Sequence, residues 1–286
     1  MSLSLAGYRI DTVDAGRVWL DGGAMFGIVP KPLWERRIAP DERNRIPLAL
    51  RCLLLRGRGR TILVDTGAGS TGDDKFQSIY GATDTLVSSL AALEVTPEDV
   101  TDVVLTHLHF DHGGGVTMRD GGGALVLSFP HATHHVGARQ WAWARESPRE
   151  QASFLAENLD PLAASDRLSL IEDLSEGAVA PGLSFEAVNG HTRGMLLPLL
   201  SDGERTLLYA ADLLPTAAHV PALWIMAYDV EPLQTLAEKE RLLADASDGG
   251  WLVVFEHDPE HACARIERTA RGFQAADARP DLPESL

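Results

Sequence analysis

A run of metal-binding side chains at residues 106–112 is the clearest chemical signal in this sequence. It reads Thr-His-Leu-His-Phe-Asp-His, so four side chains that bind transition metals lie within six residues: His107, His109, Asp111 and His112. In an extended segment, alternate residues such as His107 and His109 point to the same side. Asp111 and His112 follow where the chain turns toward three glycines, and they can face a second ion. Imidazole and carboxylate ligands favour zinc, with iron, cobalt and manganese as alternatives.

Other residues of the same types each follow a short apolar run. The runs at 103–105, 185–188, 207–211 and 252–255 lead, in that order, to His107, His191, Asp212 and His257. Runs of this length that are rich in β-branched and aromatic residues predict buried strands. Polar residues at consistent strand ends converge on one edge of a sheet, where binding sites are usually built. Four repeats of this pattern favour a metal site over a solvated, histidine-rich loop.

These motifs resemble those of the metallo-β-lactamase-fold hydrolases. The resemblance extends from the Leu-Val-Asp-Thr-Gly segment at 63–67 to His257. The early segment 21–45 looks like the lactonase branch, which includes quorum-quenching lactonases and enzymes similar to methyl parathion hydrolase. The resemblance implies an α/β fold, the αββα sandwich, in which two central sheets are flanked by helices. Because no linker-like stretch interrupts the chain, we expect a single domain over residues 1–286.

The resemblance also implies a two-metal site. One ion would be held by His107, His109 and His191. The other would be held by Asp111, His112 and His257, and the carboxylate of Asp212 would bridge both. Asp111 and Asp212 are the carboxylates expected to serve catalysis, with Asp212 helping to orient the nucleophile. Asp65 either orients a ligand from outside the coordination sphere or is a turn residue before Gly67.

A pair of metal ions would define the class of reaction. A hydroxide between two ions is a strong nucleophile at neutral pH, since metal binding lowers the pKa of water from about 15.7 to near 7. No serine or cysteine nucleophile is required, and the sequence holds no GxSxG motif. We therefore expect a binuclear hydrolase that opens lactones or cleaves related hydrophobic esters. A phosphotriesterase acting on organophosphates, a mononuclear iron dioxygenase and a pure binding module are the alternatives.

Two apolar segments indicate a hydrophobic mouth for the substrate. The residues expected to line it come from the irregular entrance or contact segment 21–46, from the metal motif and from the region after the bridging carboxylate: Met25, Phe26, Phe110, His219, Trp224 and Tyr228. For each residue taken alone, ordinary core packing is the competing interpretation. Pro215 stands where the best-known lactonases have a tyrosine, which weakens the case for acyl-homoserine lactones. Segment 23–34 is also a candidate contact for a homodimer.

The rest of the sequence predicts an ordinary α/β protein. Coarse patterning predicts a strand hairpin at 48–55 and 61–64, helices at 83–93, 96–99, 136–145 and 232–246, and a loose tail at 276–286. A formal charge of −16 argues against a nucleic-acid partner. Two cysteines are too few for a disulfide framework, and neither a signal peptide nor a membrane-spanning run is evident. We expect a cytoplasmic protein that acts on a small molecule.

Overall fold

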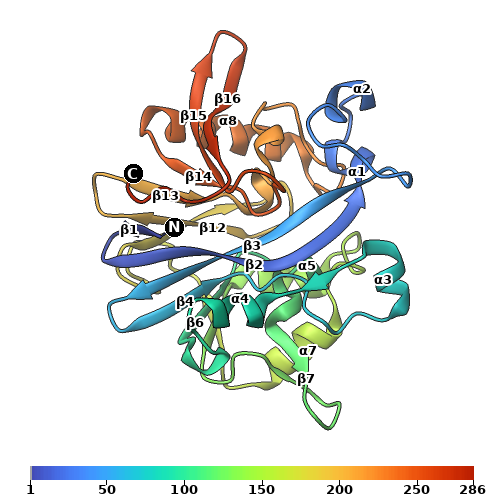
Figure 1. The fold of residues 1–286 in the computed structure, drawn as a ribbon, viewed down its shortest axis with the longest axis vertical. Coiled ribbons are helices and arrows are strands. Elements are labelled where there is room, and N and C mark those ends of the chain that lie inside the picture. The colour runs from blue at the N-terminus through green and yellow to red at the C-terminus, as the bar shows by residue number, and fades with distance from the viewer. Residues whose placement is uncertain (1) are drawn as a thin grey trace.

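Two β-sheets pack face to face at the centre of the protein (Figure 1). The structure is a computed structural model and describes residues 2–286. The first sheet has eight strands in the order β1-β2-β3-β4-β6-β9-β10, with β5 paired to β2. Its strands are β1 (Leu3–Leu5), β2 (Tyr8–Asp21), β3 (Arg45–Gly57), β4 (Arg60–Val64), β5 (Thr83–Asp84), β6 (Asp102–Leu105), β9 (Thr133–Gly137) and β10 (Leu168–Ile171).

The second sheet has six strands in sequence order, from β11 to β16. They are β11 (Leu183–Val188), β12 (Met195–Ser201), β13 (Thr206–Tyr209), β14 (Leu252–Val254), β15 (Cys263–Thr269) and β16 (Gly272–Arg279). A separate two-stranded sheet pairs β7 (Thr117–Arg119) with β8 (Leu125–Leu127). The hairpin of β15 and β16 extends beyond the body of the protein (Figure 1).

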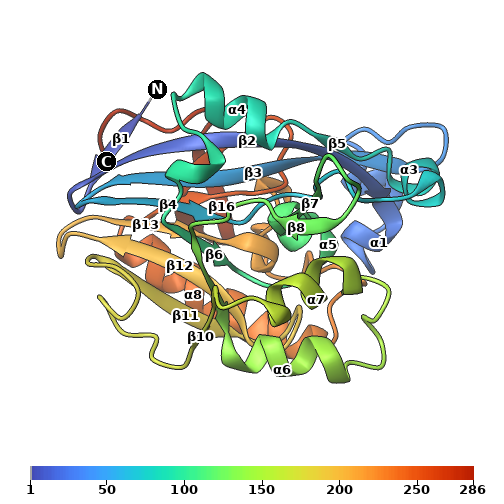
Figure 2. The ribbon, with the colours of Figure 1, turned by 90° about the horizontal axis from the view of Figure 1, so that it is seen from below.

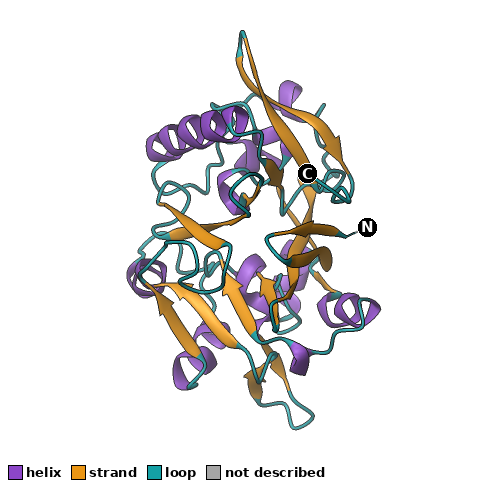
Figure 3. Ribbon diagram, turned by 90° about the vertical axis from the view of Figure 1, so that its left-hand side faces the viewer, coloured by secondary structure: helices purple, strands orange, loops and turns teal. Residues whose placement is uncertain are grey.

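Helices lie outside the strands (Figure 3). The α-helices are α1 (Gly22–Phe26), α2 (Lys31–Trp34), α3 (Asp74–Tyr80), α4 (Leu86–Ala92), α5 (Phe110–Gly113), α6 (Ala138–Glu146), α7 (Ala156–Ala164) and α8 (Pro232–Asp248). The 3₁₀ turns are η1 (Pro97–Asp99), η2 (Gly114–Val116), η3 (Ala211–Leu213) and η4 (Ala217–His219). No helix among residues 2–286 is both long enough and apolar enough to cross a membrane.

Two apolar layers stabilise this arrangement. One layer joins the two sheets and reaches α8, with Val64 and Val104 of the first sheet in the same cluster as Phe185 and Val253 of the second. The other layer fills the space between the first sheet and its helices, among them α4 and α7. Figure 2 shows α4 over the first sheet and α8 on the side of the second. The predicted αββα sandwich is therefore confirmed.

Strand direction brings the chain to one edge of each sheet at the predicted positions. β4, β6, β9 and β10 are parallel, so the residues that follow β4 and β6 emerge at the same edge. β13 and β14 are parallel within the second sheet, so Asp212 and His257 also follow neighbouring strand ends. The predicted hairpin is confirmed as the antiparallel pair β3 and β4, which turns at Arg58 and Gly59.

Several predicted boundaries are confirmed and others are wrong. The helix predicted at 232–246 is α8, and that predicted at 96–99 is η1, closed by a Thr96–Asp99 capping box. The helix predicted at 83–93 begins only at Leu86, because residues 83–84 pair with a bulge in β2 instead. The first residues of the helix predicted at 136–145 are the end of β9, a strand buried between β6 and β10.

The loose tail predicted at 276–286 is wrong for its first residues. β16 continues to Arg279 and pairs with β15, so residues 276–279 belong to the second sheet. Beyond β16, Leu282 is only 2 % exposed and packs in the layer between the sheets. Burial of one apolar side chain is worth roughly 1.5–3 kcal/mol, enough to hold the chain end against the body.

Candidate metal centre

A tight turn positions the metal-type residues that follow β6. The Thr106 amide donates to Asp65 Oδ1 (2.8 Å) and the Thr106 hydroxyl to Asp65 Oδ2 (2.7 Å), so the ends of β4 and β6 are tied together. The three following glycines pack against residues 66–69. A Cβ on Gly115 would lie 2.2 Å from the Thr66 carbonyl oxygen, so only glycine allows this approach.

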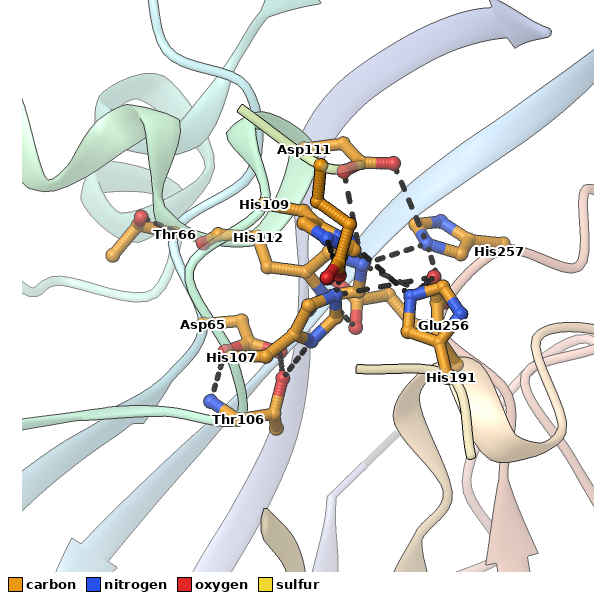
Figure 4. Close-up of polar contacts among 12 residues, drawn as sticks. Asp65, Thr66, Thr106, His107, His109, Asp111, His112, His191, Glu256 and His257 are labelled. Carbon is orange, nitrogen blue, oxygen red and sulfur yellow. Dashed lines mark hydrogen bonds and ion pairs between the residues drawn. The ribbon is translucent and has the colours of Figure 1, made fainter. Parts of the chain in front are cut away.

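The seven predicted ligand residues come together around one point. Each is at most 7 % exposed, and they form two groups of converging ligand atoms: His107, His109, His191 and Asp212 in one, and Asp111, His112 and His257 in the other. Figure 4 shows the imidazole rings meeting beneath Asp111, with Asp65 and Thr106 at the lower left next to His107. The strand-end pattern therefore located a real side-chain cluster.

The first group has the spacing of a tetrahedral site. His107 Nε2 lies 3.1 Å from His109 Nδ1, and His191 Nε2 lies 3.2 Å from the same nitrogen. Asp212 Oδ2 lies 3.1 Å from His191 Nε2 and 4.0 Å from His107 Nε2. A zinc ion with bonds of 2.0–2.1 Å separates its ligand atoms by about 3.3 Å, so these four atoms fit one ion.

The second group is similar but more open. His112 Nε2 and His257 Nε2 lie 3.1 Å apart, and the Asp111 carboxylate is 3.9 Å from the first and 3.8 Å from the second. Asp212 Oδ1 faces this group, 3.0 Å from His257 Nε2 and 3.5 Å from His112 Nε2. The two oxygens of Asp212 thus point to different groups, as a bridging carboxylate requires.

A hydrogen-bond acceptor fixes the second nitrogen of three of these imidazoles. His109 Nε2 donates to Glu150 Oε1 (2.9 Å), and His191 Nδ1 donates to Asp229 Oδ1 (2.8 Å). His257 Nδ1 donates to the carbonyl of Ala49 on β3 (2.8 Å). Because a carboxylate or carbonyl only accepts, that nitrogen carries a proton and the other ring nitrogen faces the cluster.

The remaining two imidazoles have partners next to Asp65. Thr106 gives its hydroxyl proton to Asp65, so its oxygen accepts from His107 Nδ1 (3.1 Å). His112 Nδ1 lies 2.9 Å from Glu256 Oε2 and 3.3 Å from Asp65 Oδ2. Of the two interpretations of Asp65, the geometry agrees with the one in which it orients a ligand.

The electrostatics of the cluster favour cations. Burial alone would lower the pKa of His191, but Asp212 and Asp229 outweigh it and raise that pKa to about 10. Burial would raise the pKa of Asp212, but His257, His112 and His191 hold it well below its usual range. Asp212 Oδ1 is buried and accepts no aligned hydrogen bond from residues 2–286. An ionised, incompletely paired carboxylate that raises the pKa of a neighbouring histidine marks a site that attracts positive charge, as divalent metal ions require.

A cavity of about 260 Å³ opens directly onto the cluster. Its lining includes His109, Asp111, His191, Asp212 and His257 together with apolar and polar wall residues: Leu20, Met25, Leu48, Tyr80, Phe110, Arg149, Glu150, Ser153, Met226 and Tyr228. Three of the predicted mouth residues, Met25, Phe110 and Tyr228, therefore lie where they were expected.

The other three predicted mouth residues, Phe26, His219 and Trp224, do not line this cavity. Phe26 stacks on His219 with ring centroids 4.6 Å apart and meets Trp224 edge-on at 5.6 Å. His219 Nε2 donates to the Met25 carbonyl (2.9 Å), and burial lowers the pKa of His219 to about 3. These aromatic side chains form a packed layer behind Met25, so they support the wall without facing the substrate.

Three acidic residues at the site were not predicted. Glu150 and Asp229 lie 41 and 38 residues from the histidines they contact. Glu150 is in a polar loop and Asp229 follows an apolar segment, and neither stretch has a distinctive pattern. Glu256 precedes His257 and is fully buried, so its position next to a ligand was the only available signal.

The comparisons with known proteins agree with this geometry. The sequence matches the metallo-β-lactamase superfamily over residues 46–257, and the protein belongs to that superfamily. The N-acyl homoserine lactonase AiiB of Rhizobium rhizogenes (strain K84 / ATCC BAA-868) is 26% identical over 293 residues, which cover 92% of this chain and 98% of the relative. The predicted resemblance is confirmed, and a lactonase is among its relatives.

Solved structures share the whole fold. A probable metal-dependent hydrolase from Staphylococcus aureus has a TM-score of 0.87 at 28% identity, covering 98% of this chain and 100% of the other. AidC, a dizinc quorum-quenching lactonase in complex with the product N-hexanoyl-L-homoserine, has a TM-score of 0.78 at 22% identity. That match covers 100% of this chain and 97% of AidC.

Proposed function

We propose that this protein is a binuclear metal-dependent hydrolase that opens lactones. The observation that carries the proposal is the position of Asp212, whose two oxygens face two separate groups of ligand atoms. His107, His109 and His191 would hold one divalent ion and Asp111, His112 and His257 the other, with zinc favoured by the nitrogen-rich donor set. The names of the relatives AiiB and AidC support the lactone as substrate class.

When bound, the ions would supply an activated water and polarise the carbonyl of the substrate. The side chains of the chain itself prepare the site for this chemistry. Asp212 lines the cavity and stays ionised, so it can accept a hydrogen bond from the attacking water and orient the lone pair of that water. Glu150 and Asp229 keep the protons of His109 and His191 on the outer nitrogens. These two rings are therefore already oriented with one nitrogen toward the ligand cluster before an ion binds.

The cavity wall favours a substrate with an apolar part and few charges. Met25, Phe110 and Met226 would pack against that part and exclude water from the ester group. Tyr80 and Tyr228 present phenol groups to the same space, and either can donate to an oxygen of the substrate. Such a phenol would take the place of the tyrosine that is missing at Pro215.

Two other chemistries are weaker candidates. A phosphotriester could use the same ions and the same apolar wall, so only turnover separates it from a lactone. A mononuclear iron dioxygenase would need one group of ligands alone, and the convergence of seven residues into two groups favours the binuclear site.

The test combines metal analysis with three substrate panels. Protein purified with its metals should contain about two divalent ions per chain and hydrolyse lactones faster than aryl esters or phosphotriesters. A chelator should abolish turnover, and added zinc should restore it. The variant His109→Ala should lose metal as well as activity. Phosphotriester turnover without lactone turnover would reject lactones as substrate class, and full activity of the metal-free protein would reject the metal centre.

A further inference from the structure

Arg149 is the one cationic side chain, lysine or arginine, among the described residues that line the cavity. The chain carries a formal charge of −16, so acidic side chains outnumber basic ones, and a guanidinium in the cavity wall is a rare source of strong hydrogen-bond donors. Apart from Arg149 and the ligand groups, the polar residues of the cavity wall are Tyr80, Ser153, Tyr228 and Glu150. Of these, Glu150 is already occupied by its contact with His109.

The guanidinium of Arg149 has donors to spare. Arg149 Nη2 donates to the carbonyl of Ala227 at 2.8 Å, the residue between Met226 and Tyr228 on another part of the wall. Among residues 2–286, the contact with Ala227 is the one hydrogen bond of this guanidinium, so Nε and Nη1 remain free. A guanidinium presents five N–H donors in a planar fork, so the donors that remain free on Arg149 can bind an acceptor oxygen of a substrate.

The position of Arg149 is fixed relative to the metal ligands. The next residue, Glu150, is buried and accepts from His109 Nε2 (2.9 Å), Trp143 Nε1 (2.6 Å) and the Ser147 hydroxyl (2.7 Å). The Glu150 carbonyl in turn accepts from the Ser153 amide at 2.8 Å. The segment that carries Arg149 is therefore anchored on a ligand of the first group and on the opposite wall through Ala227.

We propose that Arg149 is a specificity-determining residue that binds a second carbonyl oxygen of the substrate. This inference rests on the proposed lactonase function. With the ester group held at the ligand cluster, the spare N–H donors of Arg149 meet an acceptor carried by a substituent of the lactone ring. The carbonyl oxygen of an acyl substituent is such an acceptor, and the apolar wall residues Met25, Phe110 and Met226 fit the rest of an acyl chain. The favoured substrates are lactones with an acyl substituent.

The test compares two γ-butyrolactones of equal chain length, one with an acylamino substituent and one with a plain alkyl chain. Arg149→Ala should lower kcat/KM for the acylamino lactone by about 10- to 100-fold, mainly through KM, because a hydrogen bond to a charged donor is lost. The alkyl lactone should change by no more than about twofold. Arg145→Ala is the control, since Arg145 is exposed, stacks on Trp141 outside the cavity and should affect neither substrate.

The outcomes separate this inference from the function on which it rests. An equal loss with both lactones would mean that Arg149 only fastens the wall through Ala227, and no loss with either would mean that it does not contact the substrate. Both results overturn the recognition role and leave the lactonase function intact. Wild-type protein that turns over neither lactone would reject the function and this inference together.

Discussion

Replacement of Glu150 by glutamine tests whether the ligand histidines are preset by their outer hydrogen bonds. The side chains have the same size, but the carboxylate accepts at both oxygens and the amide accepts at only one. Three donors converge on Glu150: His109 Nε2 on Oε1, and Trp143 Nε1 and Ser147 Oγ on Oε2. Burial opposes ionisation of this carboxyl, but the hydrogen bond from His109 helps to lower its pKa to about 2, so it is an anion at neutral pH.

Either orientation of the glutamine amide carries a cost. If its oxygen faces Trp143 and Ser147, its NH₂ group faces His109 Nε2, which must then become the acceptor and move its proton to Nδ1. That change removes the lone pair that faces the first ligand group. If the amide is flipped, its oxygen accepts from His109 Nε2 and the His109 tautomer is unchanged, but the Trp143 and Ser147 donors lose their acceptor. A buried donor without a partner costs about 1–3 kcal/mol.

We therefore expect Glu150→Gln to weaken metal binding at the first group by roughly 10- to 100-fold. The free energy of unfolding of the metal-free protein should fall by about 1–3 kcal/mol. Competition with a chromophoric chelator measures the affinity, and urea denaturation in excess chelator measures the stability, since bound metal would itself stabilise the fold. Glu146→Gln, the same change at an exposed position on α6, is the control. Unchanged metal affinity in the Glu150 variant would refute the argument that it acts through His109.

Two further predictions concern stability away from the metal ligands. Asp102 is buried, and although burial opposes it, hydrogen bonds from His135 and Thr101 and the charge of Arg60 hold its pKa below the usual value. The ionised Asp102 should contribute fully to the free energy of unfolding above about pH 4. This contribution should disappear as the pH falls through the lowered pKa of the folded state. The difference in free energy of unfolding between wild type and Asp102→Asn should therefore narrow in acid titrations followed by circular dichroism. A constant gap from pH 7 to pH 2 would contradict this. Lys239→Met leaves three carbonyls in loop 219–224 without their buried donor and should cost about 2–4 kcal/mol in urea denaturation, whereas a loss below 0.5 kcal/mol would show that these bonds are dispensable.

The convergence of these metal-type side chains could be predicted because two independent patterns agree at four of the seven positions. His191 and Asp212 are residues of metal-binding type, and each follows an apolar run that forms a strand. The direction of the strands then places both residues at the same edge of the sheets, so their positions can be predicted without knowing the structure of the loops. Periodicity also predicted the longest helix, α8, whose apolar side chains repeat with helical spacing, whereas the pairing of two sheets was implied only by the family resemblance.

The outer hydrogen-bond partners could not be predicted, because tertiary packing alone determines them. Glu150 is one of several acidic residues in a polar loop, and nothing local distinguishes it from the exposed Glu146. Three of the six mouth residues, Phe26, His219 and Trp224, were predicted wrongly for a related reason. Sequence marks Phe26, Trp224 and Met25 as apolar, but which side of the wall each occupies depends on the contact between α1 and the 219–228 loop.

The two sheets hold the ligand cluster together through backbone contacts that need no metal. His257 follows a strand of the second sheet, yet its carbonyl accepts from the Ala49 amide of β3 (3.1 Å), and its Nδ1 donates to the Ala49 carbonyl. The Arg51 amide likewise donates to the Glu256 carbonyl, and the Arg51 guanidinium donates to the carbonyls of Phe255 and Asp258. These bonds fasten the loop with His257 to the sheet that carries His107 and His112. The position of His257 is therefore fixed by the same contacts that pair the sheets. A metal ion would meet this side chain already in place, and the energy of binding would not be spent on ordering it.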